Sequence, residues 1–213
     1  MNAVVTTLLC SAPDPQRGEH WQPDGRILDT LAGSITGADL TVLHDTPLRS
    51  PVPVANYRAV PGGANPYHRR WTVIADWLAT CDAEWVWCVD ATDVEMLREP
   101  WGHMEPGVIY CGSEEGATWS HPWMVDNHPS IRAVAADQPL RNAGLLGGDV
   151  ATVRQFCAVM LSELAFHSED MTDMAAFNRV AGLGCWPRVT GPWVHTRFRA
   201  EERTHPTAWW RLK

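Results

Sequence analysis

The chain has no long apolar run and no N-terminal basic segment, and both absences bear on where it works. No stretch of its 213 residues approaches the ~20 consecutive apolar residues that a membrane-spanning helix needs. The apolar start, residues 3–10, is short and lacks the basic residues that precede a secretory signal core. We therefore expect a protein without transmembrane segments that works in the cytoplasm, either of its own cell or of a host cell.

Basic residues are in the minority. The chain has 17 Lys and Arg against 25 Asp and Glu, which gives a formal net charge of −8. A protein whose main task is to grip nucleic-acid backbone needs a basic surface. Nucleic acid is therefore a less favoured partner, although local binding of an anionic nucleotide is compatible with this charge.

Several motifs are also absent. The six cysteines show no CxxC spacing and most lie in apolar runs, which predicts free buried thiols in a reducing compartment. Neither GxGxxG nor GxxxxGK[ST] occurs, so the sequence carries neither glycine-rich phosphate loop.

Tryptophan, in contrast, is abundant. The hydrophobic fraction of 45% is ordinary for a globular protein, and we expect residues 1–213 to form a single domain with a sizeable core. The 12 Trp are not ordinary. Several are expected to line a ligand groove, although core packing is the simpler interpretation for any one of them.

Strand-like and helix-like segments alternate, which predicts an α/β fold with a mixed, mostly parallel sheet flanked by helices. Short apolar, β-branched runs predict strands at residues 3–9, 40–44, 86–89, 107–111, within 142–149, and at 188–195. Helical spacing predicts helices at residues 24–34 and 67–80, a long helix with Asp149 as its N-cap, and a short one at 172–181.

Three segments do not fit this alternation. Residues 46–66 are rich in Pro and Gly and are expected to be a structureless connection, either a binding loop or disordered. Residues 117–132, ATWSHPWMVDNHPSIR, are aromatic and irregular and are interpreted as a second binding loop. The tail, TAWWRLK, either packs on the domain or contacts a membrane surface or a partner.

Two acidic residues follow a buried strand in the segment EWVWCVDATDVEML. Asp90 and Asp93 are expected at the carboxyl edge of the sheet, where open α/β sheets bind ligands. His195 ends another predicted strand, and two carboxylates with one imidazole would suit Mn²⁺ or Mg²⁺ carrying a diphosphate. The simpler alternative is that the two aspartates only turn the chain, and that the histidine is structural.

The order of these motifs resembles GT-A-type glycosyltransferases, in particular the glycogenin-like, LgtC-like and collagen hydroxylysine glycosyltransferase families. Their expected series is a first strand that holds the nucleotide, a Y-x-R helix start, DxD or DxxD, N-[AS]-G, D-Q-x-x-x-N and a late histidine. The matching segments are Tyr67–Arg69, Asp90–Val94, Asn142–Gly144, Asp173–Asn178 and Val194–His195. Met174 stands where the family has Gln, and no Gly and Lys follow the late histidine.

The resemblance implies a set of site residues. The metal, Mn²⁺ or Mg²⁺, would be held by Asp90, Asp93 and His195. The donor, a UDP-sugar, would be bound by Thr7, Leu8, Leu9, Arg69, Asp90, Asn142 and Gly144. Asp173 would lie beside the reacting carbon.

Stereochemistry depends on which acid acts. Ser168-Glu169-Asp170 resembles the x-E-D motif of inverting GT-A enzymes, whose acid is the general base. The spacing from Asp173 to Asn178 favours the retaining enzymes instead. We therefore expect a metal-dependent hexosyltransferase with Asp173 and Asp170 as candidate catalytic residues, retention being favoured.

Two other functions fit part of this pattern. A sugar nucleotidyltransferase or another metal-dependent phosphotransfer or hydrolysis enzyme would use the same metal, although the first loop lacks a Gly-rich basic signature. A non-catalytic carbohydrate-binding protein would use the tryptophans alone. The acceptor, whether protein, glycan or lipid, is not indicated by the sequence.

Overall fold

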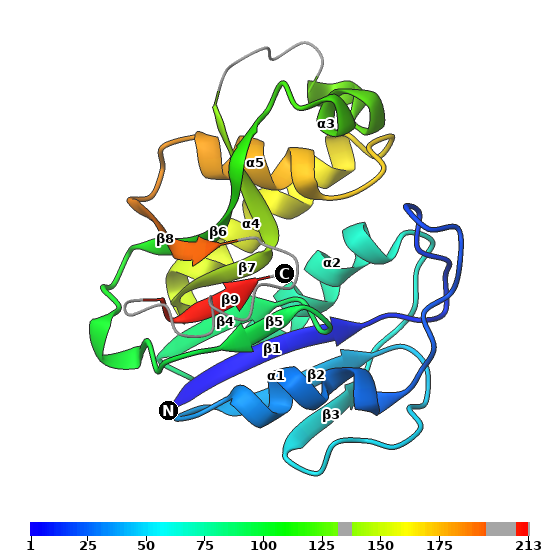
Figure 1. Ribbon diagram of the computed structural model, residues 1–213, viewed down its shortest axis with the longest axis vertical. Helices are drawn as coiled ribbons and strands as arrows, with labels where there is room; N and C mark the ends of the chain where they lie inside the picture. Colours follow the sequence, from blue (N-terminus) through cyan, green and yellow to red (C-terminus); the bar gives the residue numbers. More distant parts are fainter. Residues whose placement is uncertain (132–137, 195–207, 213) are drawn as a thin grey trace.

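A seven-stranded sheet forms the centre of the protein (Figure 1). The computed structural model describes residues 1–131, 138–194 and 208–212. The strands are β1 (Asn2–Leu8), β2 (Asp39–His44), β3 (Ala55–Ala59), β4 (Trp85–Val89), β6 (Ile109–Thr118), β7 (Pro139–Asp149) and β8 (Arg188–Val194). Their order is β3-β2-β1-β4-β7-β6-β8, and only β7 runs antiparallel to its two neighbours. The predicted mixed, mostly parallel α/β sheet is confirmed.

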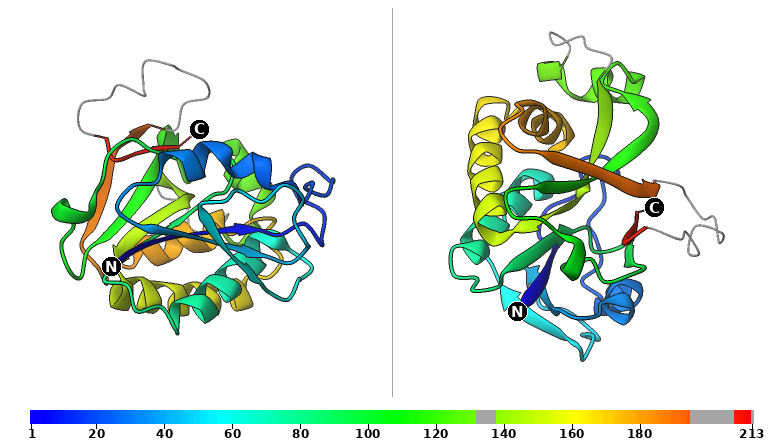
Figure 2. Two further views of the ribbon diagram at one scale, coloured as in Figure 1. Left: turned by 90° about the horizontal axis from the view of Figure 1, so that it is seen from below. Right: turned by 90° about the vertical axis from the view of Figure 1, so that its left-hand side faces the viewer.

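Two apolar layers cover the sheet because successive strand residues point to opposite faces. Val5 packs on one face with the helices α2 (Pro66–Leu78), α4 (Val150–Phe166) and α5 (Met174–Gly182). Its neighbour Val4 packs on the other face with α1 (Asp29–Ser34) and the strands β5 (Val94–Met96) and β9 (Trp210–Leu212). The two layers lie on opposite sides of the sheet in the turned views of Figure 2.

The chain changes direction across the sheet between β1 and β4. From β1 it proceeds outward to β2 and β3, and after α2 it returns to β4 on the other side of β1. The carboxyl ends of two adjacent parallel strands therefore carry connections that lead in opposite directions, and this is where open α/β sheets bind ligands. The start of β7 reaches the same edge, since Leu145 pairs with Val89.

Most of the predicted elements are present, including the Asp149 N-cap, whose carboxylate accepts from the Thr152 N–H at 2.9 Å. The helix predicted at residues 24–34 begins instead as a 3-10 turn, η1 (Gly25–Leu28). The prediction that residues 46–66 are structureless is wrong, because β3 lies there. β3 is an edge strand with mostly exposed side chains, so it has no apolar pattern that would reveal it.

The second predicted binding loop is also more ordered than expected. It contains the end of β6, the helix α3 (Pro122–Asn127) and the turn η3 (Pro129–Ile131). Trp119, Met124, Ile131 and Leu140 form a small separate core there, so buried apolar side chains stabilise this segment. In Figure 1 it lies above the sheet, next to α5.

The C-terminal segment packs on the domain, since Trp210 and Leu212 are buried and β9 pairs with β5. This agrees with the packed-tail interpretation. The six cysteines are all free, and four of them, Cys10, Cys88, Cys111 and Cys157, are buried. Within the described residues, no helix is both long and apolar enough to cross a membrane.

Candidate functional site

A cavity of about 860 Å³ opens at the carboxyl edge of the sheet, around the ends of β1 and β4. This volume is in the usual range for small-molecule sites. Of the predicted site residues, eight line it: Thr7, Leu8, Leu9, Asp90, Asp93, Asn142, Gly144 and Asp173. Tyr67 and Met174, from two of the quoted motifs, line it as well. Residues more than 160 positions apart in the chain thus meet in one cavity.

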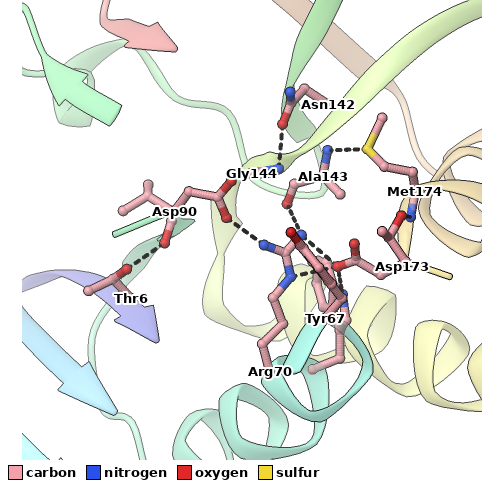
Figure 3. Close-up of polar contacts among 12 residues, drawn as sticks. Thr6, Tyr67, Arg70, Asp90, Asn142, Ala143, Gly144, Asp173 and Met174 are labelled. Carbon is pink, nitrogen blue, oxygen red and sulfur yellow. Dashed lines mark hydrogen bonds and ion pairs between the residues drawn. The ribbon is translucent and has the colours of Figure 1, made fainter. Parts of the chain in front are cut away.

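Arg70 is the centre of the polar network in this cavity (Figure 3). Its guanidinium donates to Asp90 Oδ1 and Asp173 Oδ2, both at 2.5 Å, and to the Ala143 carbonyl at 3.0 Å. Burial opposes the charged form, but Asp173 and Asp90 outweigh burial and hold the pKa of Arg70 above its ordinary value. Arg70 is therefore a fixed cation whose hydrogen-bonding capacity is largely used within the protein.

Asp173 is held in a single orientation. Its side chain is only 1% exposed, and Trp71 Nε1 donates to the same Oδ2 that accepts from Arg70. It immediately precedes α5, but it makes no side-chain cap to that helix. A buried carboxylate that faces a cavity and is paired with a cation is costly unless its partners are all in place. A buried, ion-paired carboxylate that faces a cavity is typical of a functional position.

Asp90 and Gly144 fit each other closely. The Asp90 N–H donates to the Gly144 carbonyl at 2.9 Å, and a Cβ added at Gly144 would lie 2.3 Å from Asp90 Oδ2. Asn142 Oδ1 accepts from the Gly144 N–H at 2.6 Å. Only glycine at position 144 leaves room for the Asp90 carboxylate. This explains sterically why the N-A-G segment of this chain ends in glycine.

At the end of β1 the cavity is lined by a group of residues around Asp14. The Tyr67 hydroxyl donates to this buried carboxylate at 3.1 Å and Trp21 Nε1 at 3.2 Å, while the Arg17 guanidinium lies over the Trp21 ring at 4.5 Å. Burial and the Asp14 charge raise the pKa of Tyr67, so the phenol stays protonated. Asp14 and Trp21 were not predicted as site residues, and their only sequence signal was their place in the loop after the first strand.

At the opposite end the cavity is lined by β6, α3 and the start of β7. Glu114, His121, Trp123 and Leu140 lie there, and Asn142 Nδ2 donates to Glu114 Oε1 at 2.5 Å. The second predicted binding loop, residues 117–132, thus does contribute to the site, although as a helix.

Three predicted residues are not brought into this cavity by the described structure. Arg69 does not line it and donates to the Pro61 carbonyl at 3.0 Å, while the next residue, Arg70, takes the central position. Asp170 is also elsewhere: it accepts from Ser130 and lies 3.8 Å from Arg179. His195 lies outside the described residues.

Asn178, the end of the D-x-x-x-x-N segment, joins α5 to β7. Its amide exchanges hydrogen bonds with the Arg141 backbone at 2.8 and 2.9 Å and donates to the Met174 carbonyl at 2.8 Å. It is fully buried. Its contacts position α5, and with it Asp173, instead of facing the cavity.

Two of the three residues predicted to bind a metal line the cavity. No three described His, Cys, Asp or Glu side chains form a group that could hold a metal alone. Asp90 and Asp93 nevertheless line the same cavity, and Asp90 Oδ2 makes no hydrogen bond to the described residues, whereas Oδ1 is taken by Arg70. Mg²⁺ is commonly bound by one or two carboxylates plus substrate phosphates, and Asp90 and Asp93 are the described residues that would hold such an ion here.

No protein-family model matches the chain, and a search of curated proteins finds no match either. The geometry of the cavity is therefore the main evidence on function.

Proposed function

We propose that the protein is a metal-dependent glycosyltransferase of GT-A type that moves a sugar from a nucleotide-sugar, preferably a UDP-sugar, to an acceptor hydroxyl. One observation carries the proposal. The four motif segments around Tyr67, Asp90, Asn142 and Asp173 converge on a single cavity at the switch point of the sheet. The mixed sheet with one antiparallel strand is compatible with the GT-A expectation.

The donor would lie across the ends of β1 and β4. Thr7, Leu8 and Leu9 line the side of the cavity that would take the base and ribose, with Trp21 and Tyr67 beside them. Asp90 and Asp93 would face the diphosphate and Asn142 the donor sugar. Arg70, in place of the expected Arg69, pairs with both Asp90 and Asp173 and so fixes the orientation of the two carboxylates.

A bound Mn²⁺ or Mg²⁺ would neutralise the charge that develops on the departing diphosphate. Asp90, through Oδ2, and Asp93 would hold it, with phosphate oxygens completing the coordination. Arg70 restricts Asp90 to one free oxygen because it occupies the other. Hydrogen bonds of this kind fix the orientation of a metal-ligating carboxylate.

The placement of the acids supports retention. Asp170, the candidate base for inversion, is bonded to Ser130 and does not line the cavity, whereas Asp173 does. In the reaction the acceptor oxygen forms a bond to the anomeric carbon, the bond to the diphosphate breaks, and the acceptor proton passes to the departing phosphate oxygen. Asp173 would stabilise positive charge that develops on the sugar ring.

The test is a screen of nucleotide-sugars with Mn²⁺, read by chromatography of the released nucleotide. We expect turnover of at least one UDP-sugar, and its loss in Asp90→Asn and Asp93→Ala. Asp76→Asn is the matched control, because Asp76 is an exposed carboxylate on α2 outside the cavity. Equal turnover by Asp93→Ala and wild type would contradict the metal assignment.

Product analysis separates the alternatives. If pyrophosphate forms from a sugar phosphate and a nucleoside triphosphate, the protein is a nucleotidyltransferase and the proposal fails.

NMR of the glycoside decides the stereochemistry, since a β-linked product from an α-linked donor would contradict retention.

A further inference from the structure

We infer that the α3 end of the cavity is the acceptor subsite and that it takes a neutral carbohydrate, stacked on the Trp123 indole. The inference rests on the proposed function in so far as it calls this ligand the acceptor. The existence of a sugar-binding site depends only on the residues at this end of the cavity. Trp123 lines the cavity and is half-buried, and it packs against the small core that contains Met124 and Ile131.

The indole of Trp123 is fixed in place. The fully buried His128 ring packs edge-on to it, with ring centroids 5.0 Å apart and an interplanar angle of 66°. Asn127 Nδ2 donates to the Trp123 carbonyl at 2.8 Å. Within the part of the chain that the structure describes, Trp123 Nε1 makes no hydrogen bond, so this donor is available to a ligand. A rigid aromatic surface binds a ring at a low cost in conformational entropy.

The other cavity tryptophan cannot serve in this way. Trp21 donates its Nε1 hydrogen to Asp14, and its ring face is covered by the Arg17 guanidinium. The two ends of the cavity therefore differ: the β1 end carries a cation and a covered indole, and the α3 end carries an indole not covered by a described cation. This difference suits an anionic nucleotide at the first end and a different ligand at the second.

The polar groups around Trp123 favour a polyol. His121 Nδ1 accepts from the Trp123 N–H at 3.3 Å, so in the neutral ring the proton is on Nε2, where it can donate to a ligand. Glu114 and Asn142 line the same part of the cavity, where Asn142 Nδ2 donates to Glu114 Oε1, so this wall of the cavity is polar. Sugar hydroxyls both donate and accept, while the C–H face of a pyranose is apolar enough to cover an aromatic ring.

Charge argues against an anionic acceptor at this end. The described lining residues include two arginines: Arg17 lies at the β1 end and Arg70 is committed to Asp90 and Asp173. Glu114, His121 and Trp123 line the α3 end, and the described lining residues of that end include no Lys or Arg. A phosphate-rich ligand would meet no arginine or lysine among the described lining residues of this end, which favours a neutral sugar over nucleic acid.

The test is saturation-transfer NMR on the 213-residue protein with cellotriose, maltotriose and chitotriose, and with the hexanucleotide dT6 as an anionic probe. We expect at least one trisaccharide to bind through its ring C–H protons. Trp123→Ala should weaken that binding about tenfold, the size of effect expected for a lost aromatic contact. Trp123→Phe, which keeps a ring against His128, should lie between the two.

Trp77→Ala is the matched control, since Trp77 is a half-buried tryptophan on α2 that does not line the cavity. Sugar binding that survives Trp123→Ala, binding of dT6 in preference to every trisaccharide, or no sugar binding at all would each overturn the inference.

Nucleotide release, measured in the same variants without acceptor, distinguishes this inference from the proposed function. Trp77→Ala, which lies outside the cavity, should leave donor hydrolysis near wild type. Sugar binding that depends on Trp123 in a protein that turns over no nucleotide-sugar would support the subsite and refute the transferase.

Discussion

Replacing Arg70 with methionine removes the only described cation that contacts both Asp90 and Asp173. The Asp173 side chain is 1% exposed, so its charge would be left in the interior with Trp71 Nε1 as its remaining described hydrogen-bond donor. Breaking a buried ion pair in this way costs about 3–5 kcal/mol, because the remaining charge stays desolvated. Asp90 is 34% exposed and can be rehydrated, so it adds less.

The free energy of unfolding is measured by urea titration with circular dichroism. With an m-value of about 2–3 kcal/mol/M, the expected loss lowers the urea midpoint by about 1–2.5 M. The double variant Arg70→Met/Asp173→Asn should regain about 2 kcal/mol, because it removes the uncompensated charge and keeps an acceptor for Trp71.

The matched control is Arg26→Met. Arg26 also pairs with an aspartate at 2.5 Å, but its side chain is 72% exposed, so water replaces the lost contact and the urea midpoint should stay close to wild type. The reasoning is refuted if Arg70→Met costs less than about 1 kcal/mol, or if the double variant is no more stable than the single one.

Two further predictions concern glycine and histidine. Gly144→Ala should strongly reduce nucleotide release, because the new Cβ would displace Asp90 Oδ2. The control Gly33→Ala places its Cβ in open space in α1, so this variant should fold and release nucleotide normally. Wild-type nucleotide release by Gly144→Ala would contradict the predicted fit between Gly144 and Asp90. Burial lowers the pKa of His128 below 6.5, although its hydrogen bond to Met124 and the nearby Asp170 and Asp173 oppose this shift. The unfolded chain therefore takes up the proton first as pH falls below about 6.5, so stability should decline there and level off below the folded-state pKa. In His128→Gln this part of the decline should be missing from urea titrations between pH 7.5 and 5; an unchanged pH dependence would assign it to other groups.

The fold class could be predicted because the core-forming segments carry their own pattern. Trp85–Val89 is buried at every residue, so this strand was visible in the sequence as an apolar run. α4 was visible because its apolar residues recur on one helical face. The edge strand β3 was not visible, since its residues are mostly exposed and its pairing with β2 depends on the backbone. The same reason hid the short pair of β5 and β9, whose residues are more than 100 positions apart.

The site was partly predictable. Asp90, Asn142, Gly144 and Asp173 were predicted from their place in a series of motifs, and the structure brings them together. Which of Arg69 and Arg70 lines the cavity could not be predicted from the sequence. Adjacent helical residues point about 100° apart, and only packing decides which of the two faces the sheet edge. Likewise Ser130 and Arg179 bind Asp170 away from the cavity, and neither contact has a sequence signal.

The sequence by itself determined the alternating α/β order and the acidic strand end at Asp90. These are local properties, written in hydrophobic period and residue type. Tertiary structure alone decided that Arg70 occupies the centre, that Gly144 lies against Asp90, that Asp14 and Trp21 join the site, and that Trp123 lines the far end. Such contacts join residues from β1, α2, β4, α3 and β7, and their geometry exists only after the two apolar faces of the sheet have been covered.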